Sequence, residues 1–298
     1  MAAASLLATS LAAQSPVSPA GAGMQFAADV PLVESDGVPC VSVRIGDGPE
    51  LLFGIDTGNV NSLVDTNVAK AAGLTITAIP PPVPAGYFRA IIPVLHLGTL
   101  VLEGRHALAF DFAANKMPTI AGTLAYTAFK DRIVQIDFIA RRVRITGVLD
   151  RPTAIPAPSD RFSLITFGKD GPPIVVAQGF ELDGRPVSAQ LDTMYTGSLV
   201  IYTASIAKLG LEARAHTGST EFFALTDGGV NMKVASAASE SFHGIPLGAA
   251  DRKVYFPTPG VHEPDGLFDA TAGLALFRDA VLTLDFHDGT LSVTRPGA

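Results

Sequence analysis

The chain has 298 residues, which is enough for one large domain or two ordinary ones, each with a hydrophobic core. It carries 21 Lys and Arg against 28 Asp and Glu, a formal net charge of −7, and no long basic run. This charge balance argues against a nucleic-acid partner.

The N-terminal segment is apolar. Residues 1–13 are almost all Ala, Leu, Ser and Thr, and small residues with Pro16 and Pro19 follow. This pattern is typical of a signal peptide, so we expect residues 1–24 to be a signal peptide or a flexible N-terminus and the protein to be exported, either periplasmic or secreted. Because no Lys or Arg precedes the apolar run, an Ala-rich tail is the alternative interpretation. No later run reaches 18 apolar residues, which argues against stable membrane insertion.

Strand patterns dominate the remainder. Runs of β-branched and apolar residues predict strands, among others at residues 41–45, 95–102, 133–138, 143–145, 174–176 and 281–286. Turns that carry Gly or Pro separate them. The sequence therefore predicts an all-β fold.

Helices are expected to be few and short. The two best candidates are residues 67–72 and 204–209. Thr66 and Thr203 stand where an N-cap is expected, and Gly73 and Gly210 follow the predicted ends.

A loop with one carboxylate occurs twice. Residues 52–58, LFGIDTG, return in altered form as residues 188–194, SAQLDTM. When the two copies are aligned without gaps, Asp56 and Thr57 align with Asp192 and Thr193, and residues 62–64 align with residues 198–200. Asp56 follows the apolar run at residues 51–55, so it is predicted where a core strand leaves its sheet, and Asp192 is its counterpart in the second copy.

A second block is also repeated. Residues 129–138 match residues 277–286 at most positions, and Gly122 and Gly273 stand upstream of the two copies. Asp137 and Asp285, which the blocks pair, are interpreted as structural acids that end a strand before a turn. A Pro-rich stretch at residues 149–160 reads as a linker. We predict lobes at residues 25–148 and 161–298, and a monomer with internal pseudo-twofold symmetry.

Two carboxylates favour hydrolytic chemistry. Within hydrogen-bonding distance they cannot both ionise easily, so they share a proton. One form then takes a proton from water while the other gives one to a carbonyl oxygen. This is general acid-base hydrolysis of a peptide bond without a metal or cofactor.

These features resemble the pepsin and retropepsin superfamily of aspartic peptidases, in particular bacterial retropepsin-like proteases with both lobes in one chain. The resemblance rests on the loops of Asp56 and Asp192, on Gly122 and Gly273, and on the repeated blocks, and it covers nearly all the chain after residue 25. It implies two similar β-barrel lobes with a cleft between them, one catalytic Asp from each lobe, and a hairpin flap over an extended peptide.

The resemblance also implies roles for neighbouring residues. Thr57 and Thr193 are expected to bond across the twofold axis. Asn59 and Tyr195, where the family often has Ser or Ala, either hydrogen-bond a carboxylate or face solvent or core. Tyr87 is the candidate flap residue, although it can equally anchor a Pro-rich loop, and residues 226–229 are a counterpart turn.

One position departs from the pattern. Met194 stands where the first copy has Gly58, and a glycine there leaves room for close backbone approach and unusual dihedral angles. The predicted function is an aspartic endopeptidase that acts on peptides or unfolded proteins. The alternative is a weakened or inactive peptide-binding module on the same scaffold.

Other reactive residues give little support for a different chemistry. Cys40 is the only cysteine, so no internal disulfide forms, and its strand-like surroundings favour a buried thiol over a nucleophile. The six histidines lack the spacing of a metal site, so no metal is predicted, and a metal-dependent hydrolase is a distant third hypothesis. These histidines are His96, His106, His216, His243, His262 and His287.

Overall fold

The computed structural model describes residues 24–80, 86–149, 153–166, 173–223, 230–248, 252–258 and 266–296. Strands dominate it, which confirms the all-β prediction. The helices of the described residues are short: α1 (Thr66–Ala71), α2 (Tyr126–Phe129), α3 (Thr203–Ile206), α4 (Glu212–Thr217) and the 3₁₀ helix η1 (Leu274–Leu276). None of them is long and apolar enough to cross a membrane. The predicted signal segment lies almost wholly outside the described residues.

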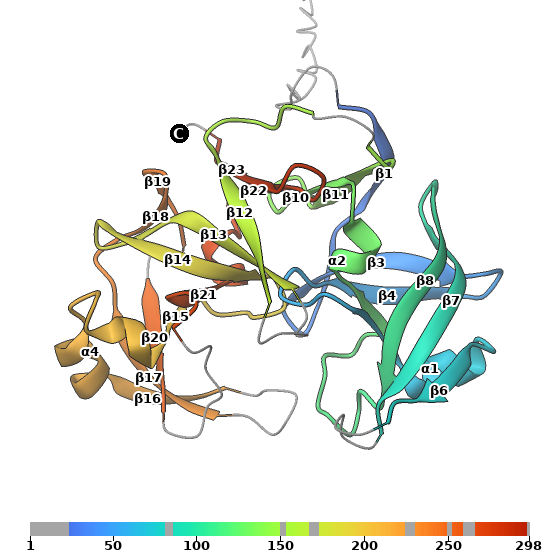
Figure 1. Ribbon diagram of the computed structural model, residues 1–298, viewed down its shortest axis with the longest axis horizontal. Helices are drawn as coiled ribbons and strands as arrows, with labels where there is room; N and C mark the ends of the chain where they lie inside the picture. The colour runs from blue at the N-terminus through green and yellow to red at the C-terminus, as the bar shows by residue number, and fades with distance from the viewer. Residues whose placement is uncertain are drawn as a thin grey trace, which may run out of the picture.

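The first lobe is an eight-stranded sheet (Figure 1). Its order is β2 (Val33–Ser35), β3 (Val38–Ile45), β4 (Glu50–Ile55), β9 (Gly122–Leu124), β5 (Ser62–Asp65), β8 (Leu100–Phe110), β7 (Phe88–Leu97) and β6 (Thr75–Ala78). β3 also pairs with β7, so the sheet curls back on itself as a barrel does.

The strands of the second lobe are one part of a larger, 15-stranded sheet. Its strands run in the order β13 (Pro173–Leu182), β14 (Arg185–Asp192), β21 (Ala270–Gly273), β15 (Leu199–Ile201), β20 (Lys253–Pro257), β17 (Val230–Ser236) and β16 (Ser219–Phe223). Two short strands, β18 (Glu240–Phe242) and β19 (Ile245–Pro246), branch from β13. β4 and β14 each pair in parallel with a later strand, β9 and β21, so both lobes place the strand that leads to the Asp in the same setting.

A joining sheet lies above the two lobes in Figure 1. It contains β1 (Phe26–Pro31), β11 (Arg142–Thr146), β10 (Ile133–Asp137), β22 (Val281–Asp285), β23 (Thr290–Thr294) and β12 (Ser159–Thr166). Gln135 of β10 stands opposite Thr283 of β22 and donates to its hydroxyl at 3.3 Å. These residues hold the same position in the repeated blocks. A local twofold axis therefore passes between them.

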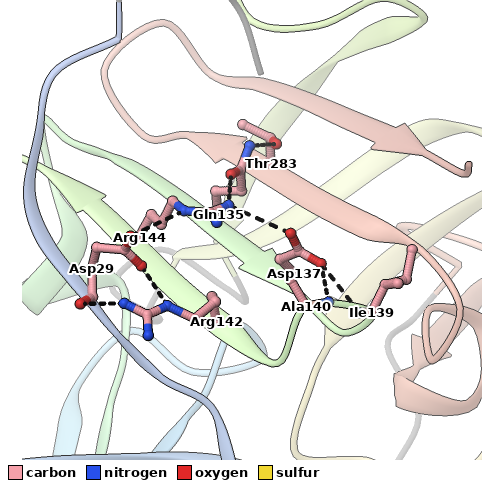
Figure 2. A network of polar contacts seen from close by, with 8 residues as sticks. All are labelled: Asp29, Gln135, Asp137, Ile139, Ala140, Arg142, Arg144 and Thr283. Carbon is pink, nitrogen blue, oxygen red and sulfur yellow. Dashed lines mark hydrogen bonds and ion pairs between the residues drawn. The ribbon is translucent and has the colours of Figure 1, made fainter. Parts of the chain in front are cut away.

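Polar contacts tie together one face of the joining sheet (Figure 2). Arg144 Nη1 donates to Gln135 Oε1 at 2.9 Å and lies 3.4 Å from Asp137 Oδ2. Arg142 pairs with Asp29 of β1 at 2.8 Å. Alternate residues on the opposite face, such as Val134 and Leu284, are buried in the core.

The acids at the strand ends of this sheet close turns. Asp137 Oδ1 accepts from the N–H groups of Ile139 and Ala140, as Figure 2 shows. Asp285 makes the equivalent pair of bonds to the N–H groups of His287 and Asp288. Both acids therefore have the structural role that the sequence indicated.

Three local predictions are wrong in detail. Thr203 is the first residue of α3 and not its N-cap, which is Tyr202. Residues 95–102 form a hairpin and not one strand, because Gly98, with φ of +57°, turns the chain between β7 and β8. Helix α1 is capped by Asp65 and not by Thr66, since Asp65 Oδ1 accepts from two N–H groups of the first turn. Gly73 and Gly210 do have positive φ values after their helices.

Candidate active site

Asp56 follows directly after β4. Its N–H donates to Leu124 O of β9 at 2.8 Å, which holds the loop against the sheet. The residue is only 2% exposed. Gly58 N–H donates to Asp56 Oδ1 at 3.1 Å, and the exposed Asn59 donates its side-chain amide to Oδ2 at 2.8 Å. Both carboxylate oxygens therefore have a donor.

Asp192 ends β14 and is partly exposed. Its Oδ1 accepts from Met194 N–H at 2.9 Å and from Tyr195 N–H at 3.2 Å. No donor among the described residues contacts Oδ2. The glycine-to-methionine change thus leaves the backbone donor at position 194 in place.

The threonines of the two loops form a closed set of bonds. Thr193 N–H donates to Thr57 Oγ1 at 3.1 Å, and Thr57 N–H donates to Thr193 Oγ1 at 3.2 Å. Each hydroxyl also donates to the opposite loop, Thr57 to Leu191 O at 3.1 Å and Thr193 to Ile55 O at 2.5 Å. Both residues are buried, so this symmetric arrangement fixes one loop against the other.

Gly58 makes room for the carboxylate of the other lobe. A Cβ on Gly58 would lie 2.5 Å from Asp192 Cγ and 2.8 Å from each carboxylate oxygen. Neither Gly58 nor Met194 has a positive φ, so unusual dihedral angles are not what the glycine provides. The requirement at this position is space.

The two acids influence each other's titration. Burial, and then the nearby charge of Asp192, raise the pKa of Asp56 to about 7, against the lowering effect of the Asn59 and Gly58 hydrogen bonds. Burial also raises the pKa of Asp192, against the effect of its two backbone donors. The pair therefore keeps a proton well above the pH at which an ordinary Asp loses it.

The two loops differ in length by one residue. Tyr126 and Thr127 N–H groups donate to Asn59 and Val60, which are consecutive. In the second lobe Leu274 and Ala275 donate to Tyr195 and Gly197, which are separated by Thr196. The ungapped match of residues 62–64 to 198–200 is therefore wrong by one residue, because Thr196 is an insertion.

The two upstream glycines are not equivalent. In strand register Gly122 pairs with Phe53, whereas Gly273 pairs with Asp192. A Cβ on Gly122 would strike the Phe53 ring at 2.4 Å, and one on Gly273 would strike the Tyr195 ring at 2.3 Å. The missing Cβ of Gly122 leaves space for the Phe53 ring, and that of Gly273 leaves space for the Tyr195 ring.

Tyr195 contacts Asp192 through its backbone, while its ring joins the core. The ring packs edge-on to Tyr255 with centroids 6.4 Å apart. It belongs to a small cluster with Val200, Met232 and Val234. Burial raises the pKa of the phenol. Asn59 is thus the residue whose side chain reaches a carboxylate.

Tyr87 packs against an aromatic cluster. Its ring lies 5.0 Å from that of Phe110, in a cluster with Leu63 and Phe112. This contact agrees with the aromatic-anchor interpretation, and the flap role stays a prediction. The counterpart turn predicted at residues 226–229 lies outside the described residues, as do residues 84 and 85 of the predicted flap segment at residues 84–89.

Two contributing residues were missed in the sequence. Gln190 Nε2 donates to Gly58 O at 3.0 Å across the lobes. Gly54, its counterpart in the first copy, lies against the Met194 side chain. The signal was present, because the repeat has Gly at positions 54 and 58 in one copy and Gln and Met in the other.

Metal ligands are not gathered in the part of the chain that the structure describes. No group of three or more His, Cys, Asp or Glu side chains there is arranged to hold a metal ion. Cys40 is buried, as the sequence indicated.

The fold matches that of known aspartic proteinases. The crystal structure of the aspartic proteinase from Irpex lacteus is 10% identical in sequence, with a TM-score of 0.51 over 91% of this chain and 97% of that one. The crystal structure of EDGP is also 10% identical, with a TM-score of 0.51 over 92% and 96%. The chain therefore has the pepsin-like aspartic proteinase fold. No model of a known protein family matches the sequence, and no curated protein is detectably similar to it.

Proposed function

We propose that the chain is an aspartic endopeptidase that hydrolyses peptide bonds with Asp56 and Asp192. One observation carries the proposal: the Asp192 carboxylate lies against Gly58, within the loop that also holds Asp56. The threonine contacts support it, because they keep the two acid-bearing loops in a fixed relation.

The proposed mechanism uses the shared proton. The ionised member of the pair takes a proton from a water molecule, and the protonated member donates to the carbonyl oxygen of the peptide. Asp192 Oδ2 is the oxygen that we assign to contact with this water, because both oxygens of Asp56 already have donors within the loop. No cofactor takes part in this scheme.

The finer parts of the proposal come from the sequence. Its internal repeat supports a bacterial retropepsin-like protease with both lobes in one chain, acting as a monomer. Its apolar N-terminal segment supports export to the periplasm or beyond. The proposed substrates are peptides or unfolded proteins, because an extended chain is what two opposed lobes accommodate.

The test is cleavage of an unfolded protein from pH 3 to pH 8 by the parent and by Asp56→Asn and Asp192→Asn. We expect both substitutions to abolish cleavage without unfolding the protein. Asp285→Asn is the matched control, since Asp285 is fully buried outside the acid pair, and it should retain cleavage. Cleavage that survives either substitution in the pair would show that the two acids are not the catalytic groups.

Met194 favours a second candidate function. Its side chain takes space beside Gly54, two residues before Asp56, that a glycine at position 194 would leave open, which suits a peptide-binding module with weakened catalysis. Absence of cleavage by the folded parent at every pH, together with saturable binding of the same unfolded substrate, would favour this alternative.

A further inference from the structure

The two acid loops are complementary and not identical. At positions 54 and 58 the first copy has glycine, whereas the second copy has Gln190 and Met194 at the equivalent positions. Both large side chains lie against the glycines of the other lobe. The side chains of the second lobe thus fill the space that the glycines of the first lobe leave open.

Met194 fills the space beside Gly54. A Cβ on Gly54 would lie 2.8 Å from Met194 Sδ and 3.4 Å from Ile120 Cδ1. Gly54 precedes Asp56 by two residues, so the two face the same side of the extended chain. The Met194 side chain therefore covers the side on which Asp56 stands.

The pseudo-twofold relation leads to the same placement. Gly58 of the first loop touches the Asp192 carboxylate, and position 194 is its counterpart in the second loop. A residue at position 194 is therefore expected to face Asp56. At this position the chain has a large apolar side chain, Met194.

The acids differ in exposure accordingly. Asp56 is 2% exposed, whereas Asp192 is partly exposed. Burial is the first cause of the raised pKa of both acids, so the acids differ in exposure and not in this cause. Among the described residues, Asp192 is the titratable group whose charge raises the pKa of Asp56, and the charge of Asp192 in turn acts on the Tyr195 phenol.

We propose that Met194 is a positioning residue that seals Asp56 from water in the space left by Gly54, so that the pair works nearer to neutral pH than one with a second glycine. The catalytic part of this inference rests on the proposed function. The sealing itself concerns the titration of Asp56 and holds for a binding module as well.

The first test compares Met194→Gly and Met194→Ala with Met24→Ala, a control that truncates a partly buried Met outside both acid loops. We expect the inflection on the alkaline side of the cleavage-against-pH profile to move to lower pH by about one unit in the two position-194 variants. Water would then reach Asp56 and lower the pKa of its carboxyl group. The control should not move it. An unchanged inflection in Met194→Gly would overturn the proposal.

A readout without activity separates this inference from the proposed function. The thermal unfolding midpoint is measured against pH for each variant and for Asp56→Asn. The difference between the two curves reports the titration of Asp56 even if the protein cleaves nothing. If the parent cleaves nothing yet Met194→Gly shifts this titration, the peptidase proposal fails and the sealing role stands. If cleavage follows the proposed scheme and neither profile shifts, the sealing role is refuted.

Complementarity has its own test. Gly54→Ala is expected to lower the melting temperature, because the new Cβ meets Met194 Sδ. Met194→Ala in the same chain should restore part of that loss. Strictly additive effects of the two changes would contradict the contact.

Discussion

Among the groups that join the two acid loops, the Thr193 hydroxyl is the one whose removal should lower the free energy of unfolding most. Thr193 is fully buried, accepts the Thr57 N–H at 3.2 Å and donates to Ile55 O at 2.5 Å. Valine has nearly the same shape without the hydroxyl. Thr193→Val therefore removes the polar contacts and leaves the packing in place.

The magnitude follows from the groups left behind. The substitution deprives the buried Thr57 N–H of its acceptor and removes one donor from Ile55 O. A buried polar group without a partner costs about 1–3 kcal/mol, so we expect the free energy of unfolding to fall by about 2–4 kcal/mol. The loops should also separate more easily, which would reduce cleavage.

Urea unfolding followed by far-ultraviolet circular dichroism measures the effect, since the chain has no tryptophan. Thr123→Val is the matched control. Thr123 is also fully buried, on β9, and its hydroxyl has no hydrogen-bond partner among the described residues. Its removal should be neutral or stabilising. If Thr193→Val loses no more stability than Thr123→Val, the cross-lobe bonds do not hold the loops as argued.

Four further outcomes are expected. Because the pKa of Asp56 is about 7 in the fold and about 3.9 for an unfolded Asp, the folded chain holds the extra proton between these values. The free energy of unfolding should therefore fall as pH rises from about 4 to about 7, and Asp56→Asn should remove this part of the dependence. Asp65→Ala leaves three N–H groups without their acceptor and should cost about 2–3 kcal/mol in urea unfolding. Burial raises the pKa of the Cys40 thiol to about 11, so mass spectrometry should find it alkylated only after unfolding. Gln190→Leu releases the Gly58 carbonyl and should lower kcat more than it changes KM.

Local patterns predicted the fold class and failed at particular turns. The run at residues 95–102 has Leu or Val at five of its eight positions, and this apolar content outweighed the one local turn signal, Gly98. The cap of α1 was displaced by one residue, because Asp65 and Thr66 are both good N-cap residues and only the hydrogen bonds distinguish them.

Internal symmetry was visible in the sequence, but its register was not. Thr196 is an insertion that an ungapped comparison passes over, because Ser62 and Ser198 happen to coincide. Gly122 and Gly273 likewise coincide as residue types while they stand at different positions of their strands. Only the pairing of strands far apart in the chain settles which residues are equivalent.

The all-β class and the pair of acids could be read from the sequence alone, because the class follows from local periodicity and the pair follows from a repeated Asp-Thr loop. Tertiary structure decided what faces each acid. Asp192 lies against Gly58, and Met194 lies against Gly54, across more than a hundred residues of chain. Such contacts follow from the close packing of one lobe on the other, where a missing Cβ on one side is the space for a side chain on the other.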